Sequence, residues 1–279
     1  MIRTLSAGDL PIPVSPERAG TPISNVIIIG AGGTGGHLFH NVLRLIKDTQ
    51  IKITLVDGDI VERKNVNRQN FFESDIGKKK AAVQANRYGR AFGVPVDIVD
   101  EFLEDETLLL DLLRSSGYRS VPVVLSCVDN HKTRKLIGRV ASNNREFFWI
   151  DSGNHEWSGQ VVCGFNGRRR IEVPTKGSSY KLFHLPNILD VHPEISRSED
   201  LFKSEISCAE MAQTNLQNIA TNIMSATCQF TMLNQLLTGE GLTSHILRFD
   251  AKSGAVSSSP TSPSALARYY EDDKTSSVV

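Results

Sequence analysis

Short runs of β-branched and other apolar residues alternate with longer segments in which apolar residues recur every three or four positions. The short runs are typical of strands buried on both faces, and the longer segments are typical of amphipathic helices. Their regular alternation predicts a parallel sheet with crossover helices on both faces. The predicted strands are 26–30, 51–57, 94–99, 121–127 and 147–151, and the predicted helices lie near 34–46, 75–91, 105–115 and 131–143.

After residue 151 the pattern changes toward antiparallel strands. Residues 159–165 and 169–173 flank Asn166 and Gly167, and an Asn-Gly pair between two apolar runs is typical of a hairpin turn. We therefore expect the mostly parallel sheet to become mixed here.

The remaining third of the chain gives a weaker pattern. Residues 174–206 have no clean period and are interpreted as a long excursion, followed by a long apolar-striped helix over 209–237. Two further strands are expected on either side of Ser253 and Gly254. We predict an α/β, Rossmann-like, doubly wound fold with the following boundaries: an extended arm over 1–24, one nucleotide-binding domain over 25–259 and a disordered tail over 260–279.

Composition is that of an ordinary globular protein. The 279 residues are 40% hydrophobic, and 31 Lys and Arg balance 31 Asp and Glu. Zero net charge gives no general attraction to nucleic acid or to an anionic membrane. The longest apolar runs are far shorter than the roughly 20 residues of a membrane span. No secretory signal or CxxC pair is present, so we expect a soluble cytoplasmic protein without a nucleic-acid or membrane partner.

A glycine-rich segment, GAGGTGG at 30–36, follows the first predicted strand and begins a helix. Gly30, Gly32 and Gly35 fit the GxGxxG pattern, in which glycine lets the backbone approach a phosphate and the helix N-terminus presents free N–H groups. Asp57 ends the second predicted strand, where a carboxylate can accept ribose hydroxyls. These features favour nucleotide binding over a glycine turn needed only for packing.

The segment after Asp57 is unusually rich in hydrogen-bond donors. Asn65, Arg68, Gln69 and Lys80 follow the second strand, at the edge where open α/β sheets bind ligands. Hydride transfer needs little positive charge there, whereas cleavage of a triphosphate needs cations on the phosphates. The alternative is a solvated loop. We favour a functional Lys80 and assign the neighbouring lysines to solvation.

Asp129 ends the fourth predicted strand in VVLSCVDNHKTR. A carboxylate at this position, together with phosphate oxygens and water, suits Mg²⁺. The alternative is that Asp129 or Asn130 caps the following helix, and both roles can hold at once.

Taken together, these motifs resemble those of the ThiF and MoeB adenylyltransferases, a family that includes the ubiquitin-activating enzymes. The resemblance rests on GAGGTGG, DGD at 57–59, NVNRQ at 65–69, GKKKA at 77–81, CVDN at 127–130 and SGQV at 158–161, in that order.

The resemblance implies adenylation, with Mg²⁺ and ATP, of the C-terminal glycine of a ubiquitin-like or sulfur-carrier protein, by a homodimer. Asp57 would hold the ribose, Asn65 and Arg68 would contact phosphates, and Lys80 would neutralise the transferred phosphate, with Asp129 as the Mg²⁺ ligand. The full set of residues expected to bind the cofactor is Gly30, Gly32, Gly33, Gly35, Asp57, Asp59, Asn65, Arg68, Gln69, Lys80, Asp129 and Asn130. The residues expected to act in the reaction are Arg68, Lys80, Asp129 and Cys208.

Cys208 lies in SCAE at 207–210, which fits a capping box with Ser207 as cap and Glu210 three residues later. A thiol in a first helical turn has a lowered pKa and is more nucleophilic. The family often carries a reactive cysteine in a similar stretch, where it accepts the activated carboxyl group or handles sulfur. A small residue that merely packs at a helix start fits equally well.

Three other functions fit parts of the pattern. Some relatives activate a tRNA base, although zero net charge weighs against this. A non-catalytic binding subunit would explain why the family's N-terminal Arg-Tyr-x-Arg-Gln stretch is absent. An NAD-dependent dehydrogenase would need only the glycine segment and Asp57.

Overall fold

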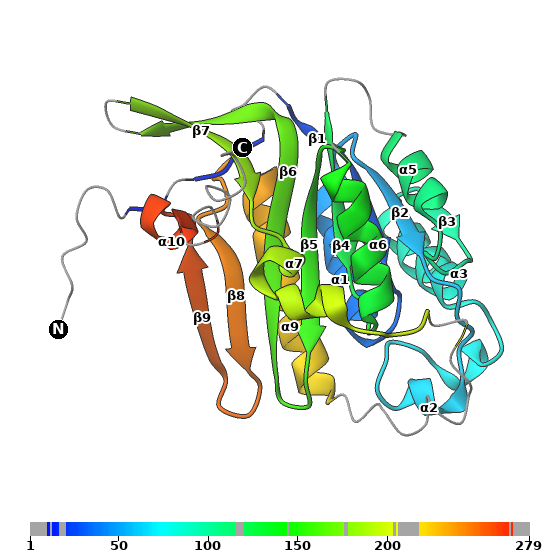
Figure 1. Cartoon of the computed structure of the whole chain (residues 1–279). Coiled ribbons are helices and arrows are strands. Elements are labelled where there is room, and N and C mark those ends of the chain that lie inside the picture. The colour runs from blue at the N-terminus through cyan, green and yellow to red at the C-terminus, as the bar shows by residue number, and fades with distance from the viewer. Residues whose placement is uncertain are drawn as a thin grey trace.

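The computed structural model describes residues 10–11, 13–16, 21–114, 120–143, 145–175, 178–202, 205, 218–267 and 269, with the side chains of 166–184 left aside. Its centre is a nine-stranded mixed sheet in the order β3-β2-β1-β4-β5-β6-β8-β9, with β7 paired to β6 (Figure 1). The strands are β1 (Ile23–Ile29), β2 (Lys52–Val56), β3 (Asp97–Val99), β4 (Val121–Ser126), β5 (Phe147–Asn154), β6 (Ser158–Thr175), β7 (Ser178–Leu185), β8 (Ser244–Asp250) and β9 (Ala255–Pro260).

The sheet has a parallel half and an antiparallel half, which confirms the α/β, Rossmann-like class expected from the sequence. Strands β1 to β5 run parallel, because a helix returns the chain between them, and β6, β8 and β9 pair antiparallel. The order 3-2-1-4 reverses direction at β1, between β2 and β4. In such sheets a crevice opens at this point, beyond the carboxyl ends of the strands.

Helices cover both faces of the parallel half. α1 (Gly33–Ile46) and α9 (Ile219–Leu237) pack on one face, and α5 (Glu106–Arg114) and α6 (His131–Ser142) on the other (Figure 1). Successive side chains of a strand point to opposite faces, so β1 supplies both cores. Val26 and Ile28 pack against the α1 side, and Ile27 and Ile29 against the α6 side.

Shorter elements complete the chain. They are α2 (Arg63–Val66), α3 (Lys80–Gln84), a π-helical turn (Ala85–Gly89), α4 (Arg90–Phe92), α7 (Ile188–Val191), α10 (Pro263–Ala267) and two 3₁₀ turns, Glu73–Asp75 and Pro193–Arg197. α10 lies inside residues 260–279, where the sequence predicts a disordered tail; the domain boundaries themselves stay predictions. No helix of the described segments is long and apolar enough to span a membrane.

The predicted hairpin at Asn166 and Gly167 is wrong. β6 continues through both residues, and its register with β7 shifts between Asn166 and Ile171. Glycine within a strand often marks such an irregularity, so the Asn-Gly pair indicates a local break in pairing here and not a chain reversal.

Two predicted helices also differ from the structure. The helix expected over 75–91 begins at Lys80, because Gly77 adopts a left-handed φ of 85° and ends the preceding turn. The helix expected over 209–237 is described from Ile219, with Asn218 as its cap, and its earlier part lies outside the described residues. The apolar stripe, which the sequence runs through Ile219 and Ile223, does not mark the buried face: both residues are exposed. Polar side chains lie on the buried face instead, and Asn222, Ser225 and Gln229 are each 1% exposed or less.

Candidate active site

One large cavity lies beyond the carboxyl ends of β1, β2, β4 and β5, with a volume of about 1260 Å³. The motifs predicted from sequence meet here although they are far apart in the chain. Of the predicted residues, those that line the cavity are Gly30, Gly32, Gly33, Asp57, Asp59, Asn65, Arg68, Gln69, Lys80, Asp129 and Asn130. Gly35 is not among the lining residues, and Cys208 lies outside the described residues.

The glycine segment joins β1 to α1 at one side of the cavity. Gly30 has a φ of 98°, which a side chain would strain. At Gly35 a Cβ atom would lie 1.8 Å from the carbonyl oxygen of Gly30, so this glycine serves the close packing of helix on strand. Gly32, the N-cap of α1, carries no capping side chain, so the first turn of α1 can offer its N–H groups to an anion.

Asp57 connects the glycine segment to the loop after β2. Its Oδ2 accepts a hydrogen bond from the Ala31 amide at 2.6 Å, and its Oδ1 accepts one from the Asp59 amide at 2.8 Å. A carboxylate can accept about four hydrogen bonds, so both oxygens keep capacity for a ligand. The carboxylate is 7% exposed and lies in the cavity wall.

The loop after β2 places a buried lysine at the cavity. The Lys80 side chain is 5% exposed, and its Nζ lies 2.8 Å from Asp59 Oδ2. Lys80 is therefore not a solvated lysine. This agrees with the sequence analysis, which favoured a functional role for it over solvation. Lys79 also differs from its assignment to solvation, because its Nζ donates to the carbonyls of Gly58 and Asp100.

Asn65 is buried in the same loop and fixes its shape. Its Oδ1 accepts a hydrogen bond from the Glu62 amide at 2.8 Å, which closes a capping box at the start of α2. Asn65 is 2% exposed, so this contact inside the loop holds its amide group in place at the cavity wall.

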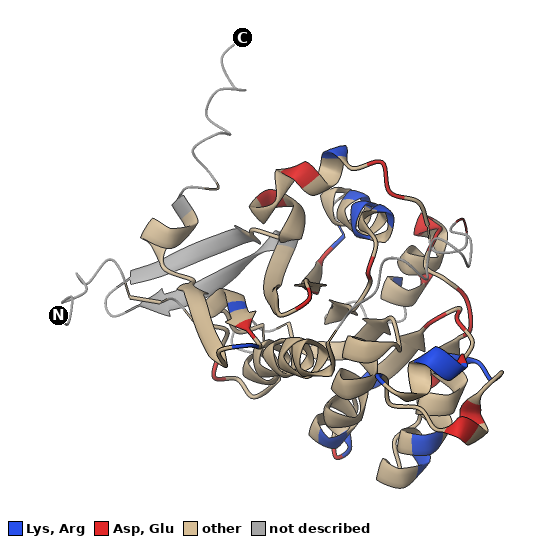
Figure 2. Cartoon of the chain, turned by 90° about the horizontal axis from the view of Figure 1, so that it is seen from below, with Lys and Arg blue, Asp and Glu red and all other residues tan. Residues whose placement is uncertain are grey.

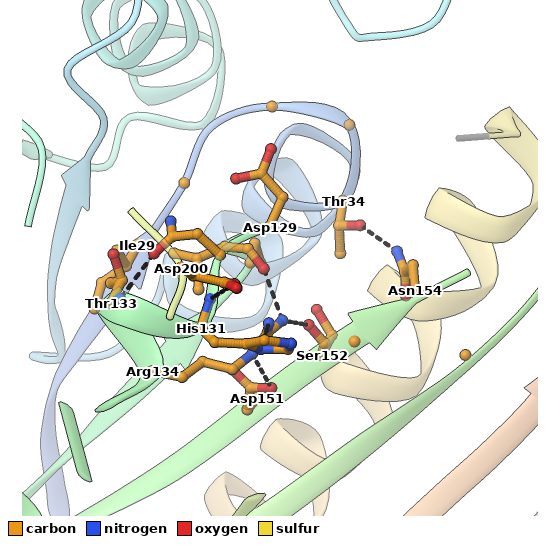
Figure 3. Close-up of a pocket in the computed structure, with 18 of the residues that line it drawn as sticks. Ile29, Thr34, Asp129, His131, Thr133, Arg134, Asp151, Ser152, Asn154 and Asp200 are labelled. Atoms are coloured by element: carbon orange, nitrogen blue, oxygen red, sulfur yellow. Dashed lines mark hydrogen bonds and ion pairs between the residues drawn. The ribbon is translucent and has the colours of Figure 1, made fainter. Parts of the chain in front are cut away.

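Across the cavity, the turn after β4 carries Asp129 and Asn130. The sequence analysis left open which of the two caps the following helix. Asn130 is buried, and its Oδ1 accepts the Thr133 amide at 2.8 Å, which caps α6. Asp129 is exposed at the cavity (Figure 3). The capping role therefore falls to Asn130, and the Asp129 carboxylate faces the cavity.

A buried ion pair that the sequence did not indicate lies beneath this turn. Arg134 of α6 and Asp151 of β5 are 5% and 1% exposed. Arg134 Nε lies 2.9 Å from Asp151 Oδ2 and 3.1 Å from Oδ1 (Figure 3). Ser126 donates a further hydrogen bond to Asp151. Burial raises the pKa of Asp151, against the opposing effect of the Arg134 charge.

A second missed cluster lies where α9 meets the glycine segment. Asn222 Oδ1 accepts hydrogen bonds from Thr34 Oγ1 and Asn154 Nδ2, both at 3.3 Å. A Cβ at Gly33 would lie 2.3 Å from Asn222 Nδ2, so α9 approaches the backbone of the loop directly. No local pattern predicts this contact, since Thr34 and Asn222 are 188 residues apart.

The described cysteines are poor nucleophiles, because their surroundings disfavour the thiolate form. Burial raises the pKa of Cys163 and, to about 11, that of Cys228. Cys127 lines the cavity and its Sγ donates to Gln229 Oε1 at 3.2 Å, yet burial raises its pKa as well.

No group of three or more His, Cys, Asp or Glu residues in the described segments could hold a metal ion by itself. The donor set fits Mg²⁺ nonetheless, because this ion keeps several waters and needs only one or two carboxylates together with substrate phosphates. Asp129, which is exposed at the cavity, is one carboxylate of the lining that could supply that contact.

The chain is similar over most of its length to a known protein family. The model of the ThiF family matches residues 22–264. The chain is 31% identical over 144 residues to the NEDD8-activating enzyme E1 catalytic subunit of Saccharomyces cerevisiae, covering 49% of this chain and 46% of that protein. It is 24% identical over 162 residues to the SUMO-activating enzyme subunit uba-2 of Caenorhabditis elegans, covering 56% and 26%. The chain thus spans less than half the length of these relatives.

Among solved structures, PaaA is similar with a TM-score of 0.56 and 18% identity, over 89% of this chain and 66% of that one. MccB of E. coli with ATP gives a TM-score of 0.53 and 18% identity, over 86% and 63%. At such identities the likeness shows a shared fold. Since the family model covers most of the chain, and the fold and motif order agree with it, the protein belongs to the ThiF family.

Proposed function

We propose that this protein is an ATP-dependent adenylyltransferase that activates the C-terminal glycine carboxylate of a small ubiquitin-like or sulfur-carrier protein. The observation that carries the proposal is the cavity itself. It brings the glycine segment, Asp57 and the cations Arg68 and Lys80 to one side, and the carboxylate of Asp129 to the other.

The chemistry of this reaction matches these residues. The acceptor carboxylate attacks the α-phosphorus of ATP, the bond to the β-phosphate breaks, and pyrophosphate leaves with the acyl adenylate formed. Both reactants are anionic, so the site must neutralise charge and align the groups. A protein base is not needed, because a terminal carboxylate is already ionised near pH 7.

Each residue then has a defined part. Asp57 accepts the ribose hydroxyls, and the amides at the start of α1 bind phosphate oxygens. Lys80 exchanges Asp59 for a phosphate oxygen when the nucleotide enters, and Arg68 binds beside it. Asp129 would hold Mg²⁺, which would supply positive charge to the departing phosphates.

The size and charge of the cavity favour a protein acceptor over tRNA. Its volume exceeds the range of about 300–1000 Å³ that is usual for one small molecule, which leaves room for a peptide tail beside the nucleotide. Acidic side chains outnumber basic ones in the lining of the cavity. In Figure 2, acidic positions also border the end of the molecule at which the parallel strands finish. Such a border is unfavourable for tRNA, because its many phosphates need many cations along the surface that binds it. Among relatives, structures of E. coli MccB exist with ATP and with MccA together with AMPCPP, and others are named activating enzymes of ubiquitin-like modifiers.

Transfer of the activated carboxyl group to Cys208, and action as a homodimer, are further parts of the proposal that rest on resemblance to the family. The alternative of a non-catalytic binding subunit predicts nucleotide binding without turnover, so the same assay separates the two.

The test is exchange of labelled pyrophosphate into ATP, with a ubiquitin-like protein ending in Gly-Gly as acceptor. Exchange is expected with the intact acceptor, and not with an acceptor that lacks its last two residues. Lys80→Ala and Asp129→Ala are expected to lower the rate by about 100-fold or more. Lys78→Ala, an exposed neighbour, is the matched control. Exchange that persists in both site variants would contradict the proposal.

A further inference from the structure

Arg134 is a buried arginine near Asp129, the proposed Mg²⁺ ligand. It lies in the first turn of α6 and lines the bottom of the cavity, with only 5% of its surface exposed. Asp129 lies just above it in Figure 3. The charge of Arg134 is already paired with Asp151, and the proposed reaction gives Arg134 no role.

The guanidinium group ties together the ends of two neighbouring strands. Arg134 Nη2 donates to the carbonyl of Val128, after β4, at 2.7 Å, and to the carbonyl of Ser152, in β5, at 2.8 Å. Nε binds Asp151 of β5, and Nη1 lies 3.2 Å from His131 Nδ1. One planar group therefore fixes four points around the turn that carries Asp129.

These contacts hold the backbone of Asp129 from both directions. Val128, whose carbonyl Arg134 binds, precedes it, and Asn130, whose side chain caps α6, follows it. The carboxylate itself remains exposed at the cavity. Because the backbone on both sides of Asp129 is held, the positions that its carboxylate can reach are limited to this part of the cavity.

Stability alone is a weak reason for this arrangement. Removing two charges from water is costly, and replacing a buried ion pair by apolar residues of similar volume is often neutral or stabilising. What an arginine adds is geometry, because its rigid fork fixes several acceptors at once in a way that lysine cannot.

We propose that Arg134 is a positioning residue for the Asp129 carboxylate, and that it thereby sets the concentration of divalent cation that nucleotide binding requires. This inference rests on the proposed function, in which Asp129 is the Mg²⁺ ligand. It adds a role for a residue that touches neither metal nor nucleotide.

The experiment compares four proteins by calorimetry: wild type, Arg134→Lys, the double variant Arg134→Gln with Asp151→Asn, and Arg139→Gln. The double variant removes both buried charges together, so that neither is left unpaired. Arg139 is the matched control, because it lies on the same helix but forms an exposed pair with Glu106 at 2.6 Å. The ligands are AMPCPP, titrated at increasing Mg²⁺, and AMP without metal.

The double variant and Arg134→Lys are expected to need about 10- to 100-fold more Mg²⁺ for half-maximal AMPCPP binding, the usual effect of losing support around a metal ligand. AMP binding should stay close to that of wild type, and Arg139→Gln should match wild type throughout. Arg134→Lys keeps the charge and so supports folding, which makes it the decisive variant if the double variant does not fold.

Two outcomes would overturn the inference: an unchanged Mg²⁺ requirement in folded Arg134 variants, or an equal loss of AMP and AMPCPP binding, which would indicate general damage. A wild-type protein that binds no AMPCPP with Mg²⁺ would instead contradict the proposed function.

Discussion

The two sides of the cavity each contain a buried cation paired with an aspartate, but the pairs differ in exposure. On the side of the glycine segment, Lys80 pairs with Asp59, whose side chain is 21% exposed. On the side of β4 and β5, Arg134 pairs with Asp151, whose side chain is 1% exposed. Under the proposed function, the first pair is exchangeable, because Lys80 gives up Asp59 for a phosphate oxygen. The second pair is enclosed, and Arg134 also binds backbone carbonyls. The difference teaches that similar ion pairs within one cavity can differ in how open they are to a ligand.

Breaking the enclosed pair should have the largest effect. Asp151→Asn leaves the Arg134 charge buried without its counter-ion, and we expect a loss of about 3–5 kcal/mol in the free energy of unfolding. Chemical denaturation measures this loss. Asp111→Asn, which breaks the exposed pair with Arg114 at 2.7 Å, should change stability by less than about 0.5 kcal/mol. If the two variants lose equal stability, the enclosed pair is not the support we describe.

Breaking the exchangeable pair should cost less and should be repaired by ligand. Asp59→Asn is expected to lower stability by about 1–2 kcal/mol, because Lys80 loses a charged acceptor in a largely buried place. AMPCPP with Mg²⁺ supplies phosphate oxygens to Lys80, so the ligand should raise the melting temperature of this variant more than that of wild type. Calorimetric melting with and without ligand tests this. The comparison fails if ligand repairs Asp151→Asn to the same degree.

The smallest effect concerns the loop that carries Lys80, and it depends on pH. Burial acts to raise the pKa of Asp75, but the Arg87 side chain, 2.5 Å away, and the Phe72 amide lower it by more, so the net pKa lies below that of a free aspartate. A lowered pKa means that the contribution to stability is present above the unfolded value, near 4, and is lost as pH falls through the folded value.

Asp75→Asn should therefore cost about 1 kcal/mol at pH 7 and progressively less below about pH 4. Urea unfolding of both proteins over this range measures the difference. A gap that stays constant with pH would show that the Asp75 charge is not what stabilises the loop.

The parts of the site that could be predicted are those whose position follows from chain order. Gly30 and Asp57 each follow a parallel strand directly, and Asp129 comes three residues after the end of β4, so all three lie at the carboxyl edge of the sheet whatever the details of packing. The parallel half of the fold was predictable for the same reason, since each of its strands has a distinct apolar run.

The parts that could not be predicted depend on contacts between distant segments. Arg134 lies in HKTRK, a polar stretch typical of an exposed helix face, and only the fold brings Asp151 to it. Asn222 lies in helix α9, whose apolar residues are not confined to one face. The apolar stripe in the sequence therefore did not identify the buried face of α9. The Asn-Gly pair at 166–167 led to a wrong hairpin prediction, because both residue types occur in strand irregularities as well as in turns.

The protonation of the buried cysteines has a practical consequence. Among the four cysteines of the chain, Cys127, Cys163 and Cys228 all have thiols whose pKa is raised, so at neutral pH they hold almost no thiolate. Toward alkylating reagents these three thiols should therefore react slowly in the native protein. Labelling of any of these three thiols by a maleimide would therefore report a local opening of the fold around it.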